Sequence, residues 1–132
     1  MTYLLDTDIL IDFFKFKEPA NSVIQQLTKR GTFALSALTI TELRSGWTPE
    51  QADRLLPQLY ALCMVEVVTK EIAQQAGTWR QEYRQQGRQF STPDTVIAAT
   101  AYLKDFSLVT KNRKDYPMPQ LQLYPWEANR EQ

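Results

Sequence analysis

The sequence contains no histidine and only one cysteine, Cys63. The missing histidine excludes a Ser-His-Asp triad, a Cys-His pair and histidine-ligated zinc. A single cysteine cannot form a disulfide within the chain, and it cannot build a thiolate zinc site. Any metal held by this chain must therefore be bound by oxygen ligands, which favour Mg²⁺, Mn²⁺ or Ca²⁺.

Long apolar runs and an excess of charge are also missing. No segment approaches the roughly 18 apolar residues of a membrane span. Residues 1–6 hold no basic segment, so we expect no signal peptide, no membrane association and a cytoplasmic location. The 15 basic and 15 acidic residues cancel, which argues against a strong nonspecific nucleic-acid binder. A nuclease that places several acids at its site remains compatible with this balance.

The length and the apolar patterns predict a single α/β domain over residues 1–132. We predict short strands over residues 3–5, 33–35, 65–68, 107–110 and near 121–124. Helices are predicted over residues 7–16, 19–29, through 40–47, over 49–62 and 70–86, and from a cap at Thr92 to Leu103. Short strands that alternate with helices favour a parallel sheet covered on both faces, with ligands beyond the carboxyl ends of the strands.

Three acids from distant segments fall near that edge of the sheet. Asp6 follows the first strand, Glu42 lies in the helix after the second, and Asp94 begins the helix before the fourth. Clustered carboxylates repel one another unless a cation joins them, and Mg²⁺ takes one or two carboxylates together with waters and phosphate oxygens. A helix cap, a solvated face or the helix dipole explains each acid alone as well or better. Only the combination indicates a metal site.

Four segments, in this order, resemble the motifs of PIN-domain ribonucleases. They are residues 4–11 (LLDTDILI), 36–43 (SALTITEL), 94–101 (DTVIAATA) and 108–116 (LVTKNRKDY). At this length the chain most resembles the VapC toxins of bacterial toxin–antitoxin pairs. The resemblance implies a three-layer α/β/α PIN-like fold and a Mg²⁺-dependent endoribonuclease, with Mn²⁺ as an alternative ion.

The resemblance also implies roles for individual residues. Asp6 and Asp94 would be the metal ligands, and Glu42 would join them as a ligand or as the group that orients the attacking water. Many relatives carry an acid at the position of Asn112, so Asp115 is the candidate fourth acid and the choice between one and two ions stays open. Candidate supporting side chains, which strand-end hydrogen bonds to the backbone explain about equally well, are Thr7, Ser36, Thr110 and Asn112.

Two groups of basic residues are candidates for binding RNA phosphates. The first recurs every four residues along one predicted helix and consists of Arg80, Arg84 and Arg88. The second lies in the loop beside the predicted site and consists of Lys111, Arg113 and Lys114. A solvated face explains the first group equally well, whereas the position of the second favours a functional role.

The resemblance implies an RNA substrate and a cognate antitoxin that presents a basic side chain to Asp6 and Asp94, and we also expect a homodimer. An exposed apolar surface at Phe13, Phe14 and Phe16 would suit the antitoxin or the homodimer.

Two other functions stay open. A receiver-like module that binds Mg²⁺ and phosphate leaves Glu42 and Asp94 unexplained. It would use Asp6, Asp8, Thr110 and Lys111. A non-catalytic PIN domain that only binds RNA is suggested by Asn112 alone.

Overall fold

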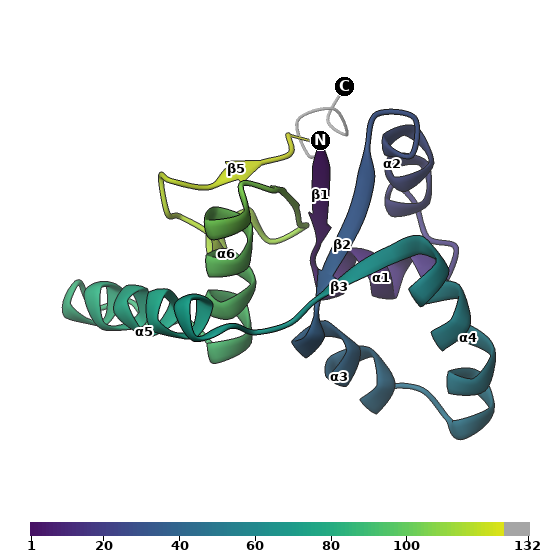
Figure 1. Cartoon of the computed structure of the whole chain (residues 1–132), viewed down its shortest axis with the longest axis horizontal. Coiled ribbons are helices and arrows are strands. Elements are labelled where there is room, and N and C mark those ends of the chain that lie inside the picture. Colours follow the sequence, from purple (N-terminus) through teal and green to yellow (C-terminus); the bar gives the residue numbers. More distant parts are fainter. Residues whose placement is uncertain (126–132) are drawn as a thin grey trace.

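The computed structural model describes residues 1–125, which form a parallel sheet between two layers of helices (Figure 1). The strands are β1 (Thr2–Leu5), β2 (Thr32–Ser36), β3 (Cys63–Glu66), β4 (Ser107–Val109) and β5 (Gln122–Leu123). Their order across the sheet is β3-β2-β1-β4-β5, and each neighbouring pair is parallel. The predicted three-layer α/β/α architecture is confirmed.

The helices fall on the two faces of this sheet (Figure 1). Those on one face are α1 (Thr7–Phe14), α2 (Ala20–Leu27), α3 (Ala37–Ser45) and α4 (Pro49–Leu62). Those on the other are α5 (Lys70–Gln85) and α6 (Thr92–Lys104). A short 3-10 turn, η1 (Arg113–Asp115), follows β4. Within residues 1–125, no helix is long and apolar enough to cross a membrane.

Alternation along the strands builds a separate core on each face, because successive strand side chains point in opposite directions. Leu5 and Leu35 pack into the core beneath α1 to α4. Their neighbours Leu4 and Ala34 pack into the core beneath α5 and α6. All four side chains are fully buried. The short continuous apolar runs of the sequence therefore correspond to strands covered on both sides.

Several predicted boundaries differ from the structure by a few residues, and two of them have a clear physical reason. The third strand ends at Glu66, and the β-branched pair Val67 and Val68, expected inside it, lies exposed beyond its end. The cap of α6 is Ser91 and not Thr92, since the Ser91 Oγ accepts a hydrogen bond from the Asp94 backbone N–H. Proline is tolerated anywhere in a first turn, so the Thr-Pro pair located this helix start only approximately.

The strand order fixes where a ligand site belongs. β1 lies between β2 and β4: the chain runs from β1 to β2 and β3 on one side, and then returns to place β4 and β5 on the other side of β1. Asp6 directly follows β1, Ser36 ends β2 and Thr110 directly follows β4. In open α/β sheets such a switch point, beyond the carboxyl ends of the strands, is where ligands bind.

Candidate active site

Asp6 is the most tightly held acid at this edge of the sheet. Its Oδ1 accepts a hydrogen bond from the Thr7 backbone N–H at 2.8 Å, which caps α1. Its Oδ2 accepts hydrogen bonds from the Thr110 hydroxyl at 2.8 Å and the Tyr116 hydroxyl at 2.9 Å. The side chain is 5% exposed. Three donors thus fix the carboxylate, and the Asp6 backbone N–H anchors the residue separately by donating to the Val109 carbonyl of β4.

The Tyr116 hydroxyl lies between Asp6 and a second carboxylate, that of Asp94. Its oxygen is 3.4 Å from Oδ1 of Asp94, which is the third residue of α6. Tyr116 is only 2% exposed and directly follows η1. Two acids that are distant in the sequence therefore meet around one buried hydroxyl.

The acids of this centre influence one another. Burial raises the pKa of Asp6, and the charge of Asp94 adds to the rise, whereas hydrogen bonds from Thr110 and Tyr116 oppose it. Burial also raises the pKa of Asp94, with further contributions from the charges of Asp115 and Glu42.

Those four acids are the ones that the sequence predicted to act together. They lie close enough for their charges to interact, although their catalytic roles stay predictions.

Glu42 joins the centre through Thr7. The Thr7 hydroxyl donates to Oε1 of Glu42 at 2.6 Å and lies 3.0 Å from the Thr39 hydroxyl. Glu42 is exposed to solvent, so this hydrogen bond is what orients it. Ser36, also predicted to support the site, is buried and caps α3 by accepting a hydrogen bond from the Leu38 N–H.

The donor set fits a hard cation. Within residues 1–125, no group of three or more His, Cys, Asp or Glu side chains is arranged to hold a metal ion, but Mg²⁺ commonly binds one or two carboxylates and keeps several waters. Asp6 and Asp94 supply two carboxylates, and neither forms an ion pair with a lysine or arginine in the described part of the chain. A divalent ion would balance this buried negative charge.

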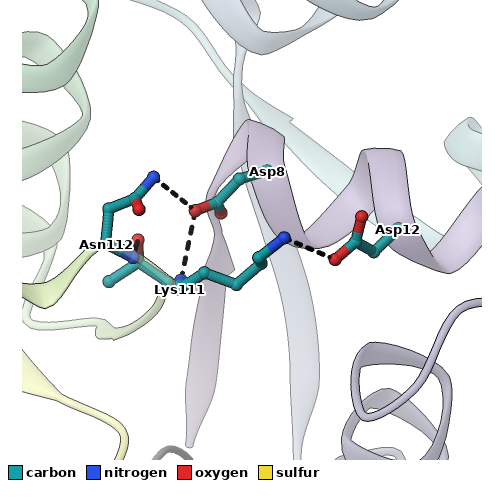
Figure 2. Close-up of polar contacts among 5 residues, drawn as sticks. Asp8, Asp12, Lys111 and Asn112 are labelled. Carbon is teal, nitrogen blue, oxygen red and sulfur yellow. Dashed lines mark hydrogen bonds and ion pairs between the residues drawn. The ribbon is translucent and has the colours of Figure 1, made fainter.

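A second set of contacts fastens the loop after β4 to α1 (Figure 2). Oδ2 of Asp8 accepts hydrogen bonds from the Lys111 backbone N–H at 3.2 Å and from the Asn112 side-chain amide at 3.0 Å. The Lys111 ammonium pairs with Asp12 at 2.7 Å. Burial raises the pKa of Asp8 to about 7, and the charge of Asp6 contributes. Asn112 therefore faces Asp8.

The basic loop residues differ from one another in the structure. Lys111 is engaged by Asp12, and the Arg113 guanidinium donates to the Tyr124 carbonyl at 3.2 Å. Lys114 is exposed, and its side chain makes no hydrogen bond or ion pair within the described part of the chain. Of the three predicted RNA contacts in this loop, Lys114 alone has an uncommitted cationic group.

The arginines of α5 separate in the same way. The Arg80 Nε donates to the Phe90 carbonyl at 3.2 Å. Arg84, one turn later, is exposed, and its side chain has no partner among residues 1–125. Both line a groove next to Ser91. The helical spacing predicted their common face, but it did not distinguish the tied arginine from the open one.

Sequence reasoning missed the part played by Tyr116. The residue was included in the fourth motif, but an aromatic side chain directly after Asp115 is most simply interpreted as a core residue. Its burial agrees with that interpretation, whereas its hydroxyl does not, because it reaches two carboxylates. The available signal was chemical: a buried tyrosine hydroxyl usually finds a hydrogen-bond partner.

Comparisons with known proteins agree with the four motifs. The PIN domain family matches residues 3–117, a range that includes all four acids of the centre. Ribonuclease VapC10 of Mycobacterium tuberculosis is 31% identical over 115 residues, which cover 87% of this chain and 86% of the relative. Ribonuclease VapC19 of the same species is 32% identical over 121 residues, which cover 90% and 96%.

Solved structures give the same result. VapBC2 from Rickettsia felis, bound to a DNA fragment from its promoter, superposes with a TM-score of 0.83 at 26% identity and covers 94% of this chain and 98% of the other. VapBC-1 from nontypeable Haemophilus influenzae superposes with a TM-score of 0.82 at 26% identity, with coverages of 96% and 99%. The similarity extends over nearly the whole fold.

Proposed function

The chain belongs to the VapC group of the PIN-domain family, and on that premise we propose that it is a Mg²⁺-dependent endoribonuclease that acts as the toxin of a toxin–antitoxin pair. One observation carries the proposal: a single buried hydroxyl joins the carboxylates of Asp6 and Asp94 at the switch point of the sheet. Two carboxylates without a protein cation suit Mg²⁺, and Mn²⁺ accepts the same oxygen donors.

We assign the metal to Asp6 and Asp94. Oδ2 of Asp6 accepts hydrogen bonds from Thr110 and Tyr116, and Oδ1 accepts one from the Thr7 backbone N–H, so the carboxylate keeps a lone pair that would be available to a cation. When bound, a divalent cation here would neutralise the carboxylates and promote attack of water on a phosphorus of the RNA backbone.

We assign Glu42 the role of assisting that attack. Thr7 holds its Oε1 at 2.6 Å, which leaves Oε2 to orient the attacking water and accept its proton. Asp115 contributes negative charge beside Asp94. This charge strengthens the attraction of the centre for a cation. We assign Asp115 no direct contact with RNA.

The toxin role requires a partner that blocks the site. The solved relatives include complexes described as toxin–antitoxin pairs, and we propose a cognate antitoxin for this chain as well. A basic side chain of the antitoxin would be attracted to the unpaired charge of Asp6 and Asp94. We place this activity in the cytoplasm, where the RNA substrate is found.

We also propose a homodimer. Its predicted apolar surface is only partly available, since Phe13 and Phe14 are half-buried and pack against each other, while Phe16 is 82% exposed.

The first test is RNA cleavage by the purified chain without any partner. The chain is incubated with a labelled pool of cellular RNA in the presence of Mg²⁺ or of chelator, and the Asp6→Asn variant is tested in the same way. The matched control is Asp53→Asn, at an exposed position on α4. We expect defined fragments that disappear with chelator and with Asp6→Asn but persist with Asp53→Asn. RNA that is bound but left intact with every divalent ion would contradict the nuclease and favour a non-catalytic RNA-binding domain.

A further inference from the structure

A groove of about 330 Å³ opens on the side of the molecule that carries α5 and α6, and the mechanism above does not use it. Its lining residues are Arg80, Arg84, Gln89, Phe90 and Ser91. The lining holds two guanidinium groups and no acid. This combination is notable in a chain whose formal net charge is zero.

Contacts within the chain hold the wall of the groove in place. The Arg80 Nε donates to the Phe90 carbonyl at 3.2 Å, which fixes the segment between α5 and α6. The Phe90 ring packs edge-on against Tyr83 with centroids 5.3 Å apart, and the Arg88 guanidinium lies 5.0 Å from the centre of the Phe90 ring. Arg84 is exposed. Within the described part of the chain its guanidinium makes no hydrogen bond or ion pair, so it is available to a ligand.

One hydrogen bond connects the lining of the groove to the carboxylate centre, and a second ties the neighbouring segment to the loop after β4. Ser91 lines the groove, and its Oγ accepts a hydrogen bond of 3.2 Å from the backbone N–H of Asp94. Arg88 donates to the Lys114 carbonyl at 3.4 Å, one residue before Asp115. The groove therefore adjoins the proposed metal ligand Asp94 through Ser91, while Arg88, which lies against the Phe90 ring, ties the segment beside the groove to the loop after β4.

We propose that this groove binds a backbone phosphate of single-stranded RNA next to the phosphodiester bond that is cut, an inference that rests on the proposed nuclease function. A guanidinium matches a phosphate in charge and in bidentate geometry. Arg84 is the binding residue, and Arg80 positions the wall through Phe90.

The charge distribution favours RNA as the occupant. The carboxylates of Asp6 and Asp94 repel an approaching polyanion. A positive site nearby is therefore needed to hold the RNA strand while the phosphodiester bond that is cut lies at the carboxylates. A strand bound in the groove would lie next to the carboxylate centre, because Ser91 caps α6 and Asp94 lies in the first turn of that helix. An acidic protein segment is the competing occupant, and the experiment separates the two.

The test measures RNA binding apart from cleavage. Fluorescence anisotropy with a labelled single-stranded RNA is recorded in an Asp6→Asn background, with Arg84→Gln as the variant. Arg30→Gln is the matched control, since Arg30 is exposed and precedes β2 at the opposite end of the sheet. We expect Arg84→Gln to weaken RNA binding about 5- to 10-fold and to lower the salt slope by about one phosphate contact. Arg30→Gln should bind as the background does.

Cleavage kinetics with Asp6 intact complete the design. Arg84→Gln should raise KM for RNA and leave kcat within about twofold, because uniform binding is lost and the chemistry is not. Equal RNA affinity for Arg84→Gln and Arg30→Gln would overturn the groove as an RNA site, even if the chain cuts RNA. If Arg84→Gln loses affinity for a partner protein but keeps its affinity for RNA, the groove binds an acidic protein segment and the proposal is overturned. If Arg84→Gln weakens RNA binding but the chain cuts no RNA, the groove is supported as an RNA-binding site and only the proposed nuclease activity is contradicted.

Discussion

The Tyr116 hydroxyl donates a hydrogen bond of 2.9 Å to Oδ2 of Asp6, although 110 positions separate the two residues. The same hydroxyl lies 3.4 Å from Oδ1 of Asp94. A hydroxyl has one hydrogen and cannot satisfy both carboxylates at once. The centre is therefore held together without being neutralised, which is the arrangement that a divalent ion would complete.

Removing this hydroxyl should destabilise the fold in the absence of metal. Tyr116→Phe takes one of three donors from a buried carboxylate, and hydrogen bonds to charged groups contribute about 1.5–3 kcal/mol. We expect a loss of that size in the free energy of unfolding, measured by urea denaturation in chelator. Tyr102→Phe, at an exposed tyrosine near the other end of α6, should change it by less than about 0.5 kcal/mol. Equal stabilities of the two variants would show that the hydrogen bond contributes nothing.

Divalent ions should stabilise the folded chain. A ligand present at about 100 times its Kd adds about 2.7 kcal/mol to the free energy of unfolding. We expect Mn²⁺ or Mg²⁺ to raise Tm by several degrees in a thermal shift assay, and Asp94→Asn to abolish the rise. Asp53→Asn should retain it. A rise that survives in Asp94→Asn would place the ion elsewhere.

Stability should also depend on the titration of Asp8. Its pKa is about 7 in the folded chain, against an ordinary value of 3.8, so the folded form keeps a proton that the unfolded form loses. The stability due to this group is fully present below pH 3.8 and declines until about pH 7. Asparagine cannot titrate, so Asp8→Asn should remove this part of the decline. Unfolding at pH 4 and pH 8 in chelator should show a gain of at least about 1 kcal/mol at pH 8 only; a gain equal at both pH values would contradict the assignment.

The Lys111–Asp12 ion pair predicts a structural role for a residue that the sequence assigned to RNA binding. Lys111→Met keeps the aliphatic stem but leaves Asp12, whose side chain is 13% exposed, without its partner. We expect a loss of about 1 kcal/mol in stability and less than twofold change in RNA affinity. The opposite pattern, unchanged stability with RNA affinity reduced as far as in Arg84→Gln, would return Lys111 to the RNA interface.

The order of the elements and the location of the site could be predicted because both depend on local patterns. Short apolar runs mark strands that are buried on two faces, and a parallel sheet places Asp6 and Thr110 at a common edge. The third strand was misplaced because β-branching suggested Val67 and Val68, whereas the sheet register pairs Cys63 with Phe33. Which residues belong to a strand depends on the register of its pairing with the neighbouring strand. The pattern of a single sequence does not reveal that register.

Side-chain partners could not be predicted at all. Lys111 and Lys114 are equivalent in the sequence, yet only Lys111 meets a buried acid, because the loop path turns it toward α1 (Figure 2). Arg80 and Arg84 share a helical face, but the segment after α5 folds back onto Arg80 alone. The tyrosine between the two metal-binding candidates depends in the same way on the route of the loop after η1.

The most direct test of the account is the rate at which the partner-free chain cuts a labelled single-stranded RNA as the Mg²⁺ concentration is varied. The account predicts a rate that rises with Mg²⁺ to saturation, a fall of at least about 100-fold in Asp94→Asn, and an unchanged rate in Asp53→Asn. A rate that does not depend on Mg²⁺ and is the same in Asp94→Asn would contradict a metal-dependent nuclease centred on Asp6 and Asp94.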